Sequence, residues 1–144
     1  MLKNVPKVSK SFLEKSIKIA KSHLYWVEKE TDSATIRQIV EESASNQNMQ
    51  VVYLDCRTLM TKEGLRSSIF VENAGNIVLF FDHIFKVPET EDSYVIVETI
   101  KYILKEGKSS GYEYKKVIAT SLCSEVESFK KYGPLICSQS VFKE

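Results

Sequence analysis

An aspartate and a histidine, Asp82 and His83, directly follow the longest uninterrupted apolar run of the sequence, residues 77–81. An aspartate at the end of a buried strand can hold a magnesium ion, directly or through water, and a histidine can act as a base near neutral pH. A strand-end aspartate can equally accept hydrogen bonds from nearby backbone N–H groups without any catalytic role. Asp82 is therefore a candidate metal ligand, and the structural alternative stays open.

A second candidate site is segment 28–35, which follows one apolar run and leads into a helical pattern. Phosphate-binding loops occupy this position between a strand and a helix, but they need glycines that let backbone N–H groups converge, and a lysine. Here three acids occur instead, Glu28, Glu30 and Asp32, and the first glycine of the chain is Gly64. The acids would repel a triphosphate, whereas they suit the start of the following helix and its dipole. We expect the helix-capping role.

Small polar residues mark the ends of two further expected strands. Thr120 and Ser121 follow one of them, and Ser138, Gln139 and Ser140 lie in the other. The hydroxyl groups could face a bound phosphate or cap a helix equally well. The sequence has no Gly-x-Ser-x-Gly turn, and Ser121 has no identifiable histidine partner. These strand ends therefore predict no hydrolase.

The cysteines and histidines show no metal-binding spacing. Cys56, Cys123 and Cys137 are odd in number and contain no Cys-x-x-Cys pair, and His23 and His83 are far apart in the sequence. We expect reduced, mostly buried thiols and no disulfide framework or zinc site.

The composition is that of an ordinary globular domain, with 144 residues, 43% apolar and 27% charged. It excludes a disordered chain and a collagen-like repeat. The apolar run at 77–81 is too short to span a membrane, and the first residues form no apolar signal core, so we expect a cytoplasmic protein. A net charge of +1 gives no global attraction for nucleic acid. Lysines recur along the amino-terminal segment that leads into and forms the first expected helix, and we interpret them as a solvated face: Lys3, Lys7, Lys10, Lys18 and Lys21.

Apolar periodicity predicts strands that alternate with helices. The expected strands are 24–27, 51–54, 77–81, 117–119 and 137–142. The expected helical segments are 10–22, one that starts at Thr31 or Asp32 and ends before a loop at 45–48, a connection across 59–70, and 91–106. The second of these strands, 51–54, is apolar throughout, as is expected when helices cover both faces of a sheet, and 77–81 is the strongest strand prediction in the chain. We expect an α/β three-layer sandwich with a five-stranded, mostly parallel sheet in one domain, residues 1–144.

Two of these helices have a predicted apolar face. In the second helix it consists of Ile36, Ile39, Val40 and Ala44. In helix 91–106 we expect Tyr94, Val95, Val97, Ile100, Ile103 and Leu104 to point inward.

Five segments in order carry a resemblance to one family. Residues 53–59 (Tyr-Leu-Asp-Cys-Arg-Thr-Leu) are similar to "Leu-Asn-Cys-Ala-Ala-Leu", and 65–70 to "Leu-Glu-Ser-Glu-Leu-Phe-Gly". Residues 74–84 resemble "Gly-Gly-Thr-Leu-Phe-Leu-Asp-Glu-Ile", and 117–121 and 135–141 resemble the later strands. Together they resemble the AAA+ ATPase domain of bacterial sigma-54 enhancer-binding activators, in a short and degenerate form.

The departures from that family fall on its functional positions. The phosphate-loop glycines coincide with Val27, Glu30 and Asp32, and its lysine with Ser33. His83 replaces the catalytic glutamate, Leu122 the sensor asparagine and Ser138 the arginine that completes a neighbouring active site. The sigma-contact loop and the helical lid have no counterpart.

The resemblance therefore implies a P-loop/AAA+-like core without the lid, and a pseudo-ATPase rather than an enzyme. The vestigial cofactor-binding positions would be Thr31, Ser33, Thr35 and Asp82, with no ATP or magnesium expected to bind. The implied function is protein–protein contact in bacterial transcription regulation or signalling. The implied partner is an active AAA+ activator or a second copy of the chain, with neither membrane nor nucleic acid involved.

Two alternatives stay open. One is a receiver-like signalling domain, because Glu28, Glu30, Asp82, Thr120 or Ser121, and Lys143 occur in a suitable order. The other is a switch that binds a nucleotide without hydrolysing it. Strand order separates the first alternative from the ATPase type: 2-1-3-4-5 is expected for a receiver and 5-1-4-3-2 for the ATPase.

Overall fold

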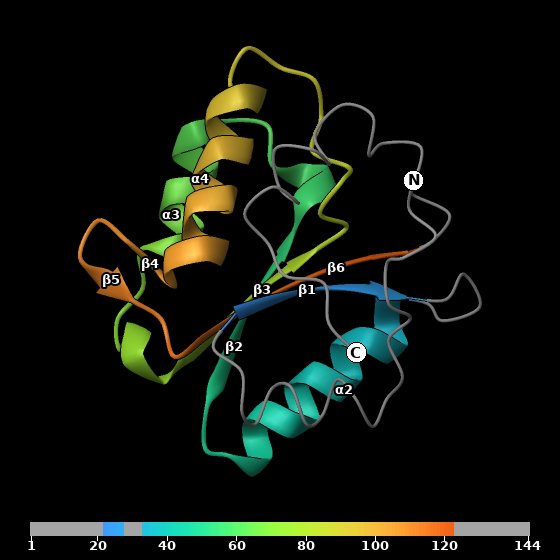
Figure 1. Ribbon diagram of the computed structural model, residues 1–144, viewed down its shortest axis with the longest axis vertical. Helices are drawn as coiled ribbons and strands as arrows, with labels where there is room; N and C mark the ends of the chain where they lie inside the picture. Colours follow the sequence, from blue (N-terminus) through green and yellow to red (C-terminus); the bar gives the residue numbers. More distant parts are fainter. Residues whose placement is uncertain (1–21, 28–32, 123–144) are drawn as a thin grey trace.

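Figure 1 shows the computed structural model, which describes residues 22–27 and 33–122. The strands are β1 (Ser22–Val27), β2 (Gln50–Asp55), β3 (Ile77–Asp82), β4 (Lys108–Ser109), β5 (Tyr112–Glu113) and β6 (Lys116–Leu122). The helices are α2 (Ser33–Asn46), α3 (Lys62–Ile69) and α4 (Ser93–Glu106), with short 3₁₀ turns at Cys56–Thr58 and Ala74–Asn76. The described part of the chain is thus an α/β unit.

The four longer strands form one parallel sheet in the order β1-β6-β3-β2. Numbered as the sequence predicted them, these strands run 1-4-3-2, which agrees with the ATPase type as far as it is described. A receiver would place the first strand between the second and the third, so the strand order contradicts that alternative. The fifth expected strand, 137–142, lies outside the described residues, and the described sheet has four strands.

Helices cover both faces of this sheet (Figure 1). Alternate residues of β3 point to opposite faces, as strand geometry requires. Val78 and Phe80 pack with Ile39, Val40 and Ala44 of α2. Ile77, Leu79 and Phe81 pack on the other face, in the cluster that includes side chains of α3 and α4. This explains why β3 is apolar along its whole length, and it confirms the expected layered arrangement.

The inward face of α4 differs in part from the sequence prediction. Ile96, Val97, Ile100, Ile103 and Leu104 are buried, as their helical spacing requires. Tyr94 and Val95 were also expected to point inward, which is wrong: they are 62% and 40% exposed. Only part of the circumference of a helix can face the core. At the amino-terminal end of α4 the side chains of Ile96 and Val97 take that part, so Tyr94 and Val95 face solvent.

Three other boundaries differ from the prediction or lie outside the description. The expected helix 10–22 is outside the described residues except for Ser22, which begins β1. The expected loop at 45–48 is helical as far as Asn46, where α2 ends in a turn with Asn48 at a positive φ of 58°. The β4–β5 hairpin was not predicted. Its two turn residues, Ser110 and Gly111, both have positive φ, which a tight two-residue hairpin needs.

Candidate functional site

The candidate site lies at the carboxyl ends of the parallel strands. Asp55 ends β2 and Asp82 ends β3, and the two residues are paired in the sheet register. Thr120 lies on the other neighbouring strand, β6. Its backbone carbonyl accepts a 3.0 Å hydrogen bond from the Ile84 N–H. The sheet therefore brings side chains from three strands to the position where α/β proteins commonly bind ligands.

The carboxylate of Asp82 is buried and engaged by the protein itself. The Tyr53 hydroxyl donates to Oδ2 over 2.7 Å, and the Thr120 hydroxyl donates to Oδ1 over 3.1 Å. The backbone N–H of His83 also donates to Oδ1, over 2.9 Å. With the residue only 1% exposed, both oxygens face protein donors rather than solvent. This matches the structural role that the sequence left open for a strand-end aspartate.

His83 turns its ring back onto the same carboxylate. Its Nε2 lies 3.6 Å from Oδ2 of Asp82, and the side chain is 3% exposed. Its φ is 56°, in the left-handed region, which is uncommon for residues other than glycine but which histidine, like asparagine and aspartate, enters more often than the rest. A general base has to reach a substrate or a water molecule. The buried ring therefore lacks the exposure that this role needs.

Tyr53 connects the site to α2. Its ring and that of Phe80 pack in a T-shaped arrangement with centroids 5.4 Å apart, and the Arg37 guanidinium lies over the Tyr53 ring, 3.9 Å from its centroid. Burial, followed by the hydrogen bond to Asp82, raises the pKa of Tyr53 far above its ordinary value of 10.0. The hydroxyl therefore remains protonated, and a donor toward Asp82, at any physiological pH.

Asp55, the second strand-end carboxylate, is paired with its own turn. Arg57 donates to it from Nε at 3.0 Å and from Nη2 at 2.7 Å, and the Arg57 backbone N–H caps the turn through the same carboxylate. The side-chain hydrogen bond from Arg57 holds the pKa of Asp55 below its ordinary range. Asp55 is thus an ionised carboxylate that already has a cation.

Magnesium, which the sequence resemblance to an ATPase domain would imply, does not fit this arrangement. A magnesium ion takes hard oxygen ligands in a nearly octahedral shell. The buried carboxylate of Asp82 already accepts three hydrogen bonds from the protein, and Asp55 is held by Arg57. Among the described residues, no three histidine, cysteine, aspartate or glutamate side chains group as metal ligands would. Asp82 is at the expected strand end, but its contacts are those of a structural residue.

The other predicted site residues are only partly described. Ser33 and Thr35 lie in the first turn of α2, with their side chains outside the description, and Thr31 is outside it altogether. The same holds for the acids at 28, 30 and 32 and for Ser138, Gln139 and Ser140. Ser121 is in β6, and Cys56 is buried as expected.

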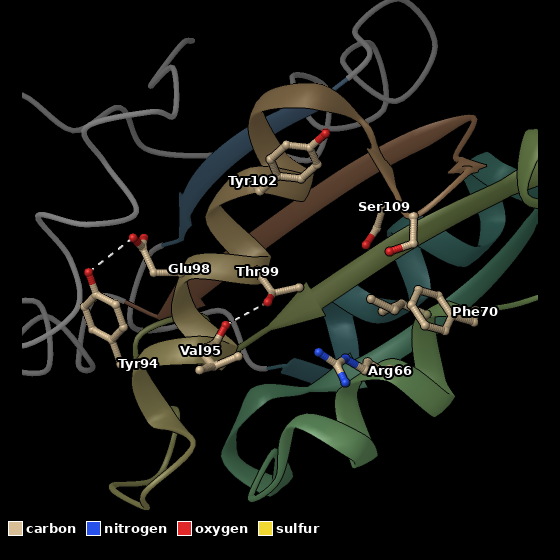
Figure 2. A pocket seen from close by; sticks show the side chains of 10 residues that line it. Arg66, Phe70, Tyr94, Val95, Glu98, Thr99, Tyr102 and Ser109 are labelled. Atoms are coloured by element: carbon tan, nitrogen blue, oxygen red, sulfur yellow. Dashed lines mark hydrogen bonds between the residues drawn. The ribbon is translucent and has the colours of Figure 1, made fainter.

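Sequence reasoning missed Tyr53 and a groove on the opposite side of the sheet from α2. The groove has a volume of about 500 Å³ and lies between α3, α4 and the β4–β5 hairpin (Figure 2). Its aromatic wall includes Phe70, Tyr94 and Tyr102. The outward spacing of Tyr94 and Tyr102 on a helix with an apolar opposite face is the signal that could have revealed it.

Comparisons with solved structures agree with this topology. A structure of Rif2 in complex with the C-terminal domain of Rap1 matches with a TM-score of 0.58 at 16% identity, over 93% of this chain and 49% of that one. A mutant of Thermotoga maritima RuvB, an AAA+ protein, matches with a TM-score of 0.50 at 12% identity, over 76% of this chain and 35% of that one. The described part of the chain is similar in fold to the matched parts of these two structures. At these identities the similarity concerns the fold alone.

The chain spans about half of the Rif2 chain and about a third of the RuvB chain. No protein-family model and no curated protein matches the sequence. No helix of the described residues is long and apolar enough to cross a membrane.

Proposed function

We propose that this chain is an AAA+-like domain without ATPase activity that acts by contact with another protein. The observation that carries the proposal is the engagement of Asp82. The aspartate at this strand end would help to hold magnesium in an active ATPase, but here Tyr53, Thr120 and the His83 backbone occupy both of its oxygens. The residue stabilises the junction of three strands instead.

The sequence around the site supports the same proposal. Segment 28–35 has no glycine to shape a phosphate loop and no lysine at the position of Ser33. His83 stands where the family has its catalytic glutamate. Loss of a single catalytic group commonly lowers the rate by two to four orders of magnitude, so several losses leave no useful hydrolysis.

Without ATP hydrolysis, we propose that the domain acts by binding another protein. The Rif2 structure, which is similar in fold, is itself a complex with another protein, and this supports a protein partner here. The more specific proposal, based on the ordered sequence likeness, is a relative of the sigma-54 activator domain in bacterial transcription regulation or signalling. Its partner would be an active AAA+ activator or a second copy of the chain, in the cytoplasm.

Thermal denaturation with ATP or ADP, each with and without magnesium, tests this proposal. A ligand at one hundred times its Kd that binds only the folded state adds about 2.7 kcal/mol, which shifts the melting temperature of such a domain by several degrees. We expect no shift at millimolar nucleotide. A magnesium-dependent shift with ATP that Asp82→Ala abolishes would contradict the proposal and favour a nucleotide switch.

A further inference from the structure

The groove between α3 and α4 combines exposed aromatic rings with a cation. Arg66 extends from α3 toward Val95 on α4, while Tyr94 and Tyr102 line the other side (Figure 2). Tyr94 is 62% exposed and Tyr102 is 48% exposed, so both rings are accessible. Tyrosine and arginine are enriched at the energetic centres of protein interfaces, because they combine a large contact area with directed polar groups.

The Arg66 guanidinium has no hydrogen bond or ion pair with another side chain in the described part of the chain. The carboxylate in the groove, Glu98, is already engaged. It accepts a hydrogen bond from the Tyr94 hydroxyl at 3.4 Å and forms an ion pair with Lys101 at 3.5 Å. Arg66 can therefore make two parallel hydrogen bonds to a carboxylate that comes from outside.

The positive charge extends along α4 beyond the groove. Lys101 and Lys105 line a second, adjacent hollow of about 380 Å³, which shares Glu98 and Tyr102 with the first. The two hollows together present three cations and one carboxylate to a ligand that spans them. An extended segment with several acidic groups complements this surface better than a compact molecule with one such group.

We propose that the two hollows together bind an acidic, aromatic-containing segment of a partner protein. A carboxylate of that segment pairs with Arg66, a second carboxylate lies near Lys105, and an apolar side chain packs between Phe70 and Tyr102. This inference rests on the proposed function and names the chemistry of the partner. A single-stranded nucleic acid fits less well. It carries a phosphate at every nucleotide, so one of them would lie near the Glu98 carboxylate, which would repel it.

Fluorescence anisotropy with the full chain and a labelled short peptide tests the inference. The probe alternates aspartate and glutamate with phenylalanine and leucine, and its neutral version carries asparagine and glutamine instead. We expect the acidic probe to bind about tenfold more tightly than the neutral one, since a hydrogen bond to a charged group contributes about that factor. Equal binding of both probes would overturn the inference.

Matched variants locate the binding. Arg66→Gln should weaken the acidic probe about tenfold. The control is Asn46→Asp, which lowers the net charge by the same amount. Asn46 is an exposed residue of α2, on the face of the sheet opposite the groove, so this variant should leave binding unchanged. Tyr102→Ala should weaken both probes, because it removes aromatic contact rather than charge. Equal losses in Arg66→Gln and Asn46→Asp would mean that only net charge matters, and would also overturn the inference.

Two further outcomes identify a different occupant. If a poly-dT oligonucleotide binds more tightly than the acidic peptide and Arg66→Gln abolishes it, the groove binds nucleic acid and the inference is wrong. If the wild-type chain sediments as a dimer that Tyr102→Ala dissociates, a second copy fills the groove and the inference is again wrong. Neither result would restore nucleotide binding, so the proposed function stands or falls separately by the ATP experiment.

Discussion

The hydroxyl of Tyr53 donates a hydrogen bond to Oδ2 of Asp82 over 2.7 Å, from one parallel strand to the next. Asp82, although it lies at a strand end, therefore has its shortest hydrogen bond to a tyrosine of the neighbouring strand. Because Thr120 reaches the other oxygen from the opposite side, the carboxylate ties β2, β3 and β6 together at their carboxyl ends. At the strand ends where α/β folds commonly bind ligands, this carboxylate is thus the centre of a hydrogen-bonded junction of three strands.

Removing the Tyr53 hydroxyl should destabilise the fold. Tyr53→Phe leaves the ring against Phe80 but leaves Oδ2 of the buried Asp82 without its shortest hydrogen bond. We expect a loss of about 1–3 kcal/mol in the free energy of unfolding, measured by urea denaturation. The control is Tyr112→Phe, whose ring stacks on Phe70 and whose hydroxyl makes no side-chain hydrogen bond within the described residues; it should change stability by less than about 0.5 kcal/mol. Equal effects of the two variants would refute the junction.

The pairing of Asp55 with Arg57 should appear in the pH dependence of stability. The pKa of Asp55 is lowered in the folded state, so its ionised form stabilises the fold above its ordinary pKa of 3.8. That contribution disappears as the pH falls through the lowered value. We expect wild type to exceed Asp55→Asn by about 0.5–1 kcal/mol at neutral pH, because asparagine still caps the turn but lacks the charge. Urea denaturation between neutral pH and pH about 2 would then show the difference closing; a difference that persists at low pH would contradict the pairing.

The fold could be predicted from the sequence wherever burial dictates residue type. The β3 run and the order of strands and helices follow from apolar patterning, since a strand covered on both faces must be apolar throughout. The inward orientation of Tyr94 could not be judged correctly, because a tyrosine suits either side of a helix and only the packed neighbours decide. The contact of Tyr53 with Asp82 was equally beyond the sequence, because it depends on which strands pair and in which register.

The outward position of Tyr94 on α4 predicts that two truncations on this helix change the free energy of unfolding by different amounts. Tyr94→Ala removes a ring that is mostly in solvent and should change stability by less than about 0.5 kcal/mol. Ile100→Ala opens a cavity beside fully buried neighbours and should cost about 2–5 kcal/mol. Thermal and urea denaturation of both variants measure this contrast. A loss of more than about 2 kcal/mol in the free energy of unfolding of Tyr94→Ala would show instead that Tyr94 points inward.

Alkaline pH should reveal the buried Tyr114. Its hydroxyl donates to the Ile69 carbonyl oxygen over 2.6 Å, and burial, with a smaller effect from Tyr112, raises its pKa to about 12. A raised pKa stabilises the fold fully below the ordinary value of 10.0 and loses its effect as the pH rises through about 12. We expect wild type to exceed Tyr114→Phe by about 1 kcal/mol at neutral pH, with the advantage shrinking above pH 10. An advantage unchanged up to pH 12 would show that folding does not raise the pKa of Tyr114, and would contradict this prediction.

The most direct test of a structural Asp82 is a manganese titration followed by NMR of the full chain, with and without ATP. Bound paramagnetic manganese, used as a substitute for magnesium, broadens the amide signals nearest to it. We predict no selective broadening at the carboxyl ends of β3 and β6, around His83 and Thr120, in either condition. Broadening centred on those amides, and absent in Asp82→Asn, would show that the aspartate binds a metal ion and would contradict its structural role.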